Sequence, residues 1–308
     1  MAMKKHLVRL LKLALTVVIL YFLYRQVAGH WTDIKDYEWQ VDVPMLCLSI
    51  LGGLVALLIL SGSWKLIIGG FGHRVTPMMA FRIAYLSNLG RYIPGKVWQV
   101  FGMLYLARRQ GIPPETTTAS AVMIQVFCVP ASLLVFVLAA LIEPQVAGAP
   151  AAVVGSASVY VIAVLILAGC AAIILWLQPI LNLGNRLLRR AGRPPVVFTG
   201  DKKVAPVIFL GYFIAWIVYG AAFWLFIRAV MGASSPGFIV CLGLYNVSYQ
   251  VGYLMLFAPG GLGPRELVMG AFLMPFIGPL GAAVAIMARI WTIVIETLAT
   301  AIALAVRK

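Results

Sequence analysis

The chain has 308 residues, of which 63% are hydrophobic and 11% charged, and it carries a formal net charge of +15. Soluble domains are about half apolar and about a quarter charged, so this composition excludes an ordinary soluble enzyme and indicates a multi-pass membrane protein. The excess of Lys and Arg is explained first by orientation signals in cytoplasmic loops, so nucleic acid is not an expected partner.

The first half of the chain is predicted to begin with two membrane spans. Apolar segments at Leu10–Val27 and Pro44–Ile68 are each long enough to cross the hydrocarbon core. Basic residues precede the first segment, and residues 33–42 after it carry four acids and one base. Because cytoplasmic flanks are rich in Lys and Arg, the N-terminus is predicted to be cytoplasmic.

A broken hairpin follows these two spans. Its apolar pieces, Pro77–Gly90 and Val97–Ala107, have 14 and 11 residues. As helices they reach only roughly 21 and 16 Å, against roughly 30 Å of hydrocarbon. Basic residues flank both pieces, which favours a re-entrant hairpin that enters from the cytoplasm and lines a protein cavity. The chain is then predicted to cross outward at Ala119–Ile142.

The second half is predicted to repeat this order in the opposite orientation. The span Ala151–Leu177 leads into the densest basic loop, Arg186–Lys203, which we assign to the cytoplasm. The span Ala205–Ile227 leads out, a second broken hairpin covers Phe238–Pro279, and Leu280–Val306 is the last span. Both termini of this multi-pass protein are therefore predicted to lie on the cytoplasmic side of the cytoplasmic (inner) membrane.

Two interpretations of residues 238–257 stay open. At 20 residues the segment could cross by itself, which would move the C-terminus outside. The hairpin is favoured because a crossing leaves a short last span that contains Glu296. With the hairpin, residues 10–142 and 151–306 form an inverted repeat of about six transmembrane helices and two re-entrant helical hairpins, in a single all-α domain over residues 1–308. In secondary transporters, paired broken helices of this kind form the substrate site near the membrane midplane.

Six ionisable residues are predicted near the middle of the bilayer, where a charge costs several kcal/mol unless it is paired or hydrated. They are Arg91, Lys96, Arg265, Glu266, Arg289 and Glu296. In a functional interpretation the breaks hold a lipid phosphate, with Arg91 and Arg265 as forked donors and Lys96 as a point charge. Half-helices beginning near Val97 and Leu267 would add backbone N–H groups. The surplus of bases over acids suits an anionic head group.

In a structural interpretation the same residues only hold the hairpins in place, with Glu266 paired to Arg289 and Glu296 paired to Arg265. We give the two interpretations equal weight for Glu266, Arg289 and Glu296, which are the candidates for ion pairing and proton coupling. The functional one is favoured for the three bases of the breaks, because the acids are too few to neutralise them all.

Polar residues and breaks complete the candidate site. Asn88, Asn246 and Gln250 lie on hairpin arms, where they either bind head-group oxygens or link helices, and the linking role is slightly favoured. The candidate substrate-binding residues are Arg91, Lys96, Arg265, Tyr92 and Asn88. The candidate hairpin breaks are Pro94, Gly95, Pro259, Gly260, Gly261 and Gly263. The sequence contains no Walker-type phosphate loop and no His or Cys spacing typical of a metal site, so neither a cofactor nor a metal is expected.

The two breaks read Gly90-Arg91-Tyr92-Ile93-Pro94-Gly95-Lys96-Val97-Trp98 and Pro259-Gly260-Gly261-Leu262-Gly263-Pro264-Arg265-Glu266. In this order, about 165 residues apart, they resemble the lysylphosphatidylglycerol synthase transmembrane-region family. In its best-known member the membrane region acts as a flippase for aminoacylated phosphatidylglycerol, and a separate cytosolic domain makes the lipid. The resemblance covers essentially the whole chain. Because Lys308 ends the sequence, we expect a stand-alone member without the synthase domain, and lysyl transfer is not implied.

These features predict a lipid flippase or scramblase rather than an enzyme. An anionic or phosphate-bearing lipid is expected to cross with its head group in a polar cavity between the hairpins; the candidates are an aminoacylated phospholipid, a phospholipid and a polyprenyl-phosphate-linked glycolipid. One alternative is a non-catalytic membrane partner of a glycosyltransferase or lipid-modifying enzyme. A second, an integral-membrane lipid transferase, is weaker because Glu115 and Asp201 stand alone as cytoplasmic acids. The partners considered are membrane lipids, such an enzyme, and a second copy of the chain in a homo-oligomer.

Overall fold

The computed structural model describes residues 28, 31–39, 41–92, 97–148, 156–175, 177–190, 192–200, 204–255 and 261–305. Over these residues the chain consists of helices and loops without a strand, which confirms the predicted all-α fold class. The predicted first span, Leu10–Val27, lies outside the described residues.

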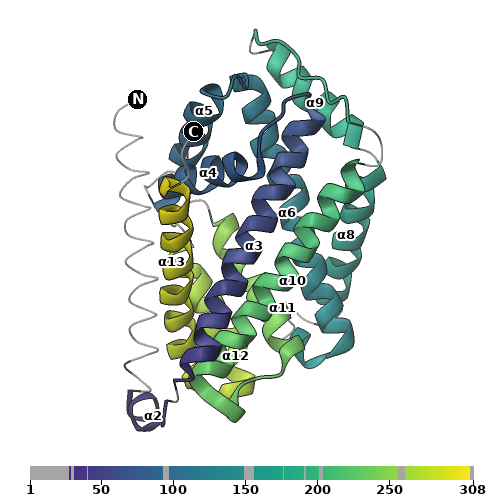
Figure 1. The fold of residues 1–308 in the computed structure, drawn as a ribbon. Helices are drawn as coiled ribbons and strands as arrows, with labels where there is room; N and C mark the ends of the chain where they lie inside the picture. Colours follow the sequence, from purple (N-terminus) through teal and green to yellow (C-terminus); the bar gives the residue numbers. More distant parts are fainter. Residues whose placement is uncertain are drawn as a thin grey trace, which may run out of the picture.

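The helices follow one another closely along the chain (Figure 1). In order they are α2 (Trp31–Asp36), α3 (Val43–Gly70), α4 (Pro77–Asn88), η1 (Leu89–Tyr92), α5 (Val97–Arg108), α6 (Pro114–Ile142), α8 (Ser156–Leu175), α9 (Leu177–Arg190), α10 (Val204–Met231), η2 (Gly232–Ser234), α11 (Phe238–Leu254), α12 (Pro264–Ile277) and α13 (Leu280–Ala305). Four of them, α3, α6, α10 and α13, are long and apolar enough to cross a membrane.

Local sequence signals explain where several helices begin. Proline occupies one of the first two positions of α3, α4, α6 and α12, where its fixed φ suits the helix and its missing N–H costs nothing. Asp42 caps α3 by accepting a hydrogen bond from the Met45 N–H at 2.9 Å. Thr76 caps α4 in the same way through Met79 at 3.2 Å. These signals depend only on neighbouring residues, so the starts of these helices are fixed locally.

The basic region after α8 differs from its prediction. We expected a loop over Arg186–Lys203, but its first residues belong to the helix α9, which spans residues 177–190. Residues 192–200 contain no helix, as expected. Leu181 is buried and Leu188 packs against the core, and a spacing of seven residues places both on one face of a helix. The Asn185 side chain accepts a hydrogen bond from the Val196 N–H at 2.8 Å and thereby holds the following segment to α9. A high density of Arg therefore marked an amphipathic helix.

The long helices run between two ends of the molecule, which we name the α2 end and the α9 end (Figure 1). At the α2 end the N–H of Asp42, just before α3, donates to the C=O of Ala229 near the end of α10, at 2.9 Å. At the α9 end the N–H of Thr199, just before α10, donates to the C=O of Gly70 at the end of α3, at 2.8 Å. The helices α3 and α10 are therefore antiparallel neighbours.

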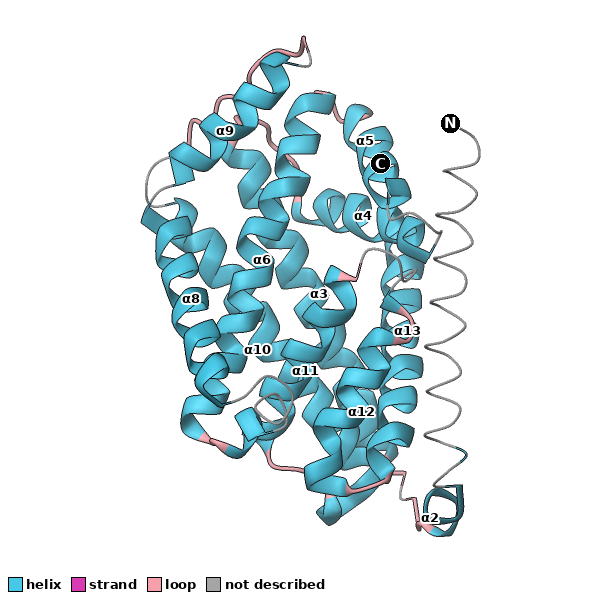
Figure 2. Cartoon of the chain, turned by 180° about the vertical axis from the view of Figure 1, so that it is seen from behind, coloured by secondary structure: helices cyan, strands magenta, loops and turns pink. Residues whose placement is uncertain are grey.

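Two pairs of short helices reverse halfway along the bundle. The pair α4 and α5 enters and leaves at the α9 end, and the pair α11 and α12 at the α2 end (Figures 1 and 2). The first pair reaches Glu296 through Arg91, and the second reaches Thr292 through Arg265. Both contacts fall near the middle of the 26-residue helix α13. The two hairpins thus approach each other from opposite ends, as expected; their re-entrant position in a bilayer and the inverted repeat stay predictions.

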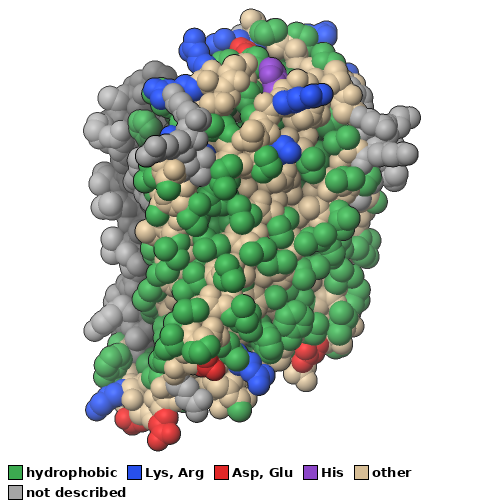
Figure 3. All heavy atoms as spheres, viewed as in Figure 1, with side chains coloured by type: hydrophobic (Ala, Val, Ile, Leu, Met, Phe, Trp, Pro, Cys, Tyr) green, Lys and Arg blue, Asp and Glu red, His purple; other side chains and the backbone are tan. Residues whose placement is uncertain are grey.

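The surface has an apolar middle and charged ends. In Figure 3, hydrophobic side chains cover the central part of the face shown, and Lys and Arg gather at the α9 end. Large apolar side chains on the long helices are exposed, among them Leu48, Leu51 and Leu58 of α3 and Val207 and Leu210 of α10. A continuous apolar surface of this kind marks contact with lipid. The chain is therefore a multi-pass membrane protein.

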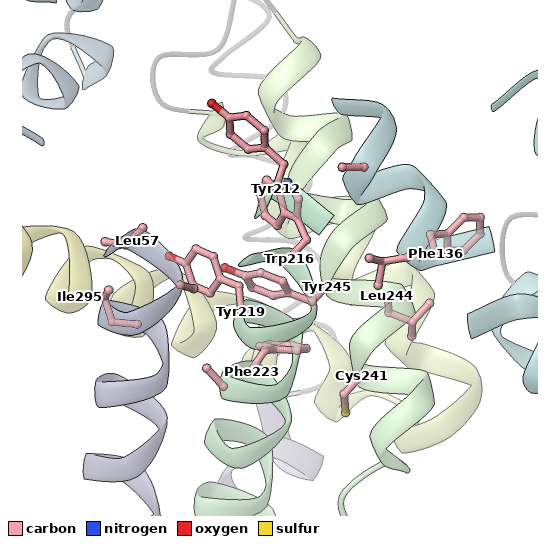
Figure 4. Packing of buried hydrophobic residues seen from close by; sticks show 14 of the residues in the cluster. Leu57, Phe136, Tyr212, Trp216, Tyr219, Phe223, Cys241, Leu244, Tyr245 and Ile295 are labelled. Atoms are coloured by element: carbon pink, nitrogen blue, oxygen red, sulfur yellow. The ribbon is translucent and has the colours of Figure 1, made fainter. Parts of the chain in front are cut away.

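An aromatic core joins α10 to α11 (Figure 4). The ring of Tyr245 lies 5.1 Å from that of Tyr219 and 4.8 Å from that of Phe223, between centroids, within the range of favourable aromatic pairs. Small residues let α3 approach the same core, because a Cβ placed on Gly52 would lie 3.1 Å from the Cβ of Ala222. This packing fixes the position of α11, which carries residues of the candidate site.

Candidate functional site: a polar cavity between the hairpin turns

A cavity of about 160 Å³ lies where the two hairpins approach each other. Helices α3, α4, α5, α6, α10, α11 and α13 all contribute to its walls, which carry Arg91 and Glu296. A larger cavity of about 380 Å³ shares Arg91, Gln99 and Gln125 with it, and one of about 60 Å³ shares Glu296. The three spaces meet around Arg91 and Glu296.

An ion pair lies at this meeting point. The Nη1 atom of Arg91 is 2.8 Å from Oε1 of Glu296, and their side chains are 12% and 9% exposed. Arg91 also donates to the hydroxyl of Tyr249 on α11 at 3.3 Å. The 3₁₀ turn η1 places Arg91 at the tip of its hairpin, and Gly90 is required there because a Cβ would lie 2.5 Å from the backbone of Trp98. One side chain therefore joins both hairpins to α13.

The partner of Glu296 differs from the structural interpretation of the sequence, which paired it with Arg265. Arg91 occupies that position instead, because the first hairpin reaches α13 from the α9 end. The sequence separation of 205 residues gave no local indication of this pair. Arg91 therefore has a carboxylate partner, and its contact with a lipid phosphate stays a prediction.

Arg265 lies apart from the cavities described above. Its side chain is 3% exposed, and it donates to the hydroxyl of Thr292 at 3.2 Å. Its guanidinium lies over the rings of Tyr249 and Tyr245, at 4.6 and 5.2 Å from the centroids. Aromatic faces attract a desolvated cation, so this charge is held by the core. Contact of Arg265 with a lipid phosphate stays a prediction.

Glu266 and Arg289 face each other, as the structural interpretation of the sequence predicted. The distance between Oε1 of Glu266 and Nε of Arg289 is 3.7 Å, and both side chains are buried. Glu266 also accepts a hydrogen bond of 2.6 Å from the N–H of Gly263, whose φ of +93° suits glycine alone. The helix α12 begins at Pro264, and not near Leu267 as expected, because Pro264 starts the turn that this carboxylate caps.

The amide side chains of the hairpins divide into two groups. Asn246 is a linker, as favoured from the sequence: it donates to the Trp216 C=O at 3.3 Å and accepts from the Ser132 hydroxyl at 2.9 Å. Asn88 accepts from Gln99 at 3.2 Å, which joins α4 to α5 inside the cavity wall. Gln250 is different. It is 2% exposed and lines the cavity, yet its Nε2 atom has no hydrogen-bond partner in the described part of the chain.

Several candidate residues fall outside the described residues: Pro94, Gly95, Lys96, Pro259 and Gly260. Tyr92 ends η1, but its side chain is likewise not described. Gly261 is described; its φ is +73°, and a Cβ there would lie 2.8 Å from the carbonyl oxygen of Gly252. It lines the larger cavity. The second break therefore depends on glycine for both its conformation and its close approach to α11.

Four residues of the cavity wall were not among the predicted site residues. Gln99, Gln125, Tyr249 and Tyr253 line one or both of the larger cavities. The two glutamines carried a usable signal, because an amide inside an apolar helix must find a polar partner. The tyrosines carried none, because aromatic residues are equally common at membrane interfaces.

A family model matches nearly the whole chain. The model of the family described as "Lysylphosphatidylglycerol synthase TM region" matches residues 9–299. No curated protein matches the sequence.

Proposed function

Because the chain belongs to the lysylphosphatidylglycerol synthase TM region family, we propose that it is a lipid flippase or scramblase of the cytoplasmic membrane. The observation that carries this proposal is the cavity at the meeting point of the two hairpins, with a charged pair buried halfway along the bundle. A charge at such depth is costly and therefore indicates a pathway for polar groups. The proposed substrate is a phosphate-bearing lipid whose head group passes through this cavity.

The ion pair between Arg91 and Glu296 can bind a phosphate and release it again. The Arg91 guanidinium can donate two parallel hydrogen bonds to a phosphate, which binds more strongly than a single neutral acceptor. An incoming phosphate competes with Glu296 for Arg91, so Glu296 loses this contact while the head group is bound. Glu296 is then the carboxylate placed to take up a proton and return it when Arg91 pairs again. Binding and release are thereby coupled to one side chain.

The apolar chains of the lipid need a way out to the bilayer. The larger cavity extends from Arg91 between α5 and α6 and is lined there by Val100 and Val122. Val122 is 56% exposed on the apolar surface. A lipid with its head group near Arg91 can therefore leave its chains in the membrane through this opening, which we call the α5–α6 opening.

Filling the α5–α6 opening tests this route. We expect Val100→Trp to slow lipid translocation in proteoliposomes by about tenfold, equivalent to about 1.4 kcal/mol on the barrier, because the indole occupies the path of the chains. The control is Val126→Trp, the same change at another half-buried valine, on α6 and outside these cavities. Equal rates for the two variants, with equal melting temperatures, would place the route elsewhere.

The sidedness follows from charge. The α9 end carries exposed Arg108, Arg109, Arg189 and Arg190, and cytoplasmic segments are enriched in such residues. We therefore propose that the α9 end and both termini are cytoplasmic.

Labelling of single cysteines measures this orientation. In a background lacking Cys47, Cys128, Cys170 and Cys241, we expect Lys35→Cys and Gln145→Cys to react with an impermeant maleimide added outside intact cells. Arg190→Cys should react only after the cells are opened. External labelling at position 190 would reverse the assignment of both ends.

One observation favours a second function, that of a non-catalytic membrane partner of a glycosyltransferase or lipid-modifying enzyme. The helix α9 exposes Arg186, Arg189 and Arg190 at one end of the bundle, and such a basic helix can dock a partner or anionic lipid. Translocation by the purified protein alone decides between them: an anchoring subunit gives none, whereas a flippase needs no partner. In either case we propose that the chain itself has no enzymatic activity.

A further inference from the structure

We propose that the head group carried through the cavity is uncharged and rich in hydroxyl groups beyond its phosphate, as in a sugar joined to a lipid through phosphate. This inference rests on the proposed function and names the substrate class of the same site. It follows from the charge of the described cavity walls, from their amide side chains, and from two buried donors without partners.

The charge of the wall is balanced. Among the described residues lining the two larger cavities, the charged side chains are Arg91 and Glu296, one of each sign and already 2.8 Å apart. A head group with an ammonium group needs a carboxylate of its own while the phosphate holds Arg91. Glu296 is the single carboxylate in the described part of this wall, and in the proposed cycle it takes up a proton while the phosphate holds Arg91, so it has no negative charge for an ammonium group. The described wall therefore has no further charged side chain that could pair with a second charge on the head group.

The wall has instead the groups that match hydroxyls. Asn88, Gln99, Gln125 and Gln250 each carry an amide, which donates and accepts hydrogen bonds at once. A hydroxyl group also donates and accepts, so hydroxyl groups can pair with both the N–H and the C=O of such an amide. Carboxylates only accept and guanidinium groups only donate. A wall of amides therefore favours a polyhydroxylated head group over a charged one.

Two donors in this wall have no partner among the described residues. They are Nε2 of Gln250, in a side chain 2% exposed, and the hydroxyl of Tyr212, in a side chain 1% exposed. Figure 4 shows the Tyr212 hydroxyl pointing away from the aromatic core of Trp216, Tyr219 and Tyr245. Buried donors without acceptors are costly, and both residues line the cavity. Hydroxyl groups of a bound head group would satisfy them.

The probes are three lipids: a short-chain polyprenyl phosphate bearing one hexose, the same polyprenyl phosphate without the sugar, and lysyl-phosphatidylglycerol. Binding is measured as the rise in the melting temperature of the purified protein when the lipid is added. Translocation is measured in proteoliposomes. We expect the hexose-bearing lipid to bind about tenfold more tightly than the sugar-free lipid, which corresponds to about one good hydrogen bond. It should also bind more tightly than lysyl-phosphatidylglycerol.

Gln250→Leu tests the role of the amide. It should remove the preference for the hexose and leave the melting temperature of the lipid-free protein unchanged or higher, because it deletes a buried donor that lacks a partner. The matched control is Gln110→Leu, the same change at an exposed residue outside the cavities, which should keep the preference.

The outcomes separate this inference from the proposed function. Tighter binding of lysyl-phosphatidylglycerol, or an unchanged hexose preference in Gln250→Leu, overturns the inference even if lipids are translocated. Selective binding of the hexose-bearing lipid without translocation supports the inference and overturns the proposed function. Binding of none of the three probes overturns the inference.

Discussion

The double variant Arg91→Met with Glu296→Gln is expected to fold about as stably as the parent chain and to translocate no lipid. The side chains of Arg91 and Glu296 are largely buried, and their Nη1 and Oε1 atoms lie 2.8 Å apart. Replacing both members of a buried ion pair by uncharged groups of similar size is often neutral or stabilising. Transport depends on Arg91 as the phosphate donor, so stability returns in the double variant and transport does not.

The single variants separate stability from function. Arg91→Met alone leaves the Glu296 carboxylate in the core without its guanidinium partner, and breaking a buried pair in this way costs about 3–5 kcal/mol. We therefore expect a lower melting temperature for Arg91→Met than for the double variant, with no transport by either. Arg228→Met removes an arginine exposed at the end of α10 and should change neither quantity. Normal transport by the double variant would show that the head group does not contact Arg91.

The second large effect concerns Glu266 and Arg289. Glu266→Gln keeps an oxygen that can accept from the Gly263 N–H but removes the negative charge that faces Arg289 at 3.7 Å. We expect a loss of about 3–5 kcal/mol, seen as a lower melting temperature. Adding Arg289→Met should recover most of this loss, because the cation that needs a carboxylate is then gone.

Transport should distinguish this pair from the first one. Neither Glu266 nor Arg289 lines the described cavities, so the double variant Glu266→Gln with Arg289→Met is expected to translocate lipid at nearly the parent rate. Glu38→Gln, a change at an exposed acid of the α2 end, is the control for both measurements. A stable double variant without transport would instead assign proton coupling to Glu266.

Much of the fold is predictable from the sequence because it depends on short stretches of chain. Length and hydropathy define a span without reference to any other segment, and the starts of α3 and α4 depend on a cap and a proline within a few residues. The pieces of the first hairpin are too short for the hydrocarbon core, which indicated its reversal. The second reversal was favoured because a crossing at residues 238–257 leaves a short last span. The basic stretch that forms α9 was misjudged because its charge was weighed and the spacing of Leu181 and Leu188 was not.

Charged residues inside the bundle were also predictable, and so was the pairing of Glu266 with Arg289, but the pairing of Arg91 with Glu296 was not. Arg91, Glu266 and Glu296 could be recognised singly, because a charge inside an apolar segment is conspicuous in any sequence. Which carboxylate meets which base depends on how two hairpins approach α13 from opposite ends. That geometry is set by packing between segments far apart in the chain, and sequence spacing does not encode it.

The clearest case is the pair of amides on α11. Asn246 and Gln250 lie one helical turn apart and both carry an amide, so the same role was predicted for both. The tertiary structure assigns Asn246 to hydrogen bonds with α10 and α6 and leaves the Gln250 amide in the cavity wall. The sequence by itself determined that polar groups lie inside this membrane domain, because solvation free energy is a property of each residue. Only the tertiary structure decided which of them link helices and which line the cavity, because a hydrogen bond requires its partner within about 3 Å.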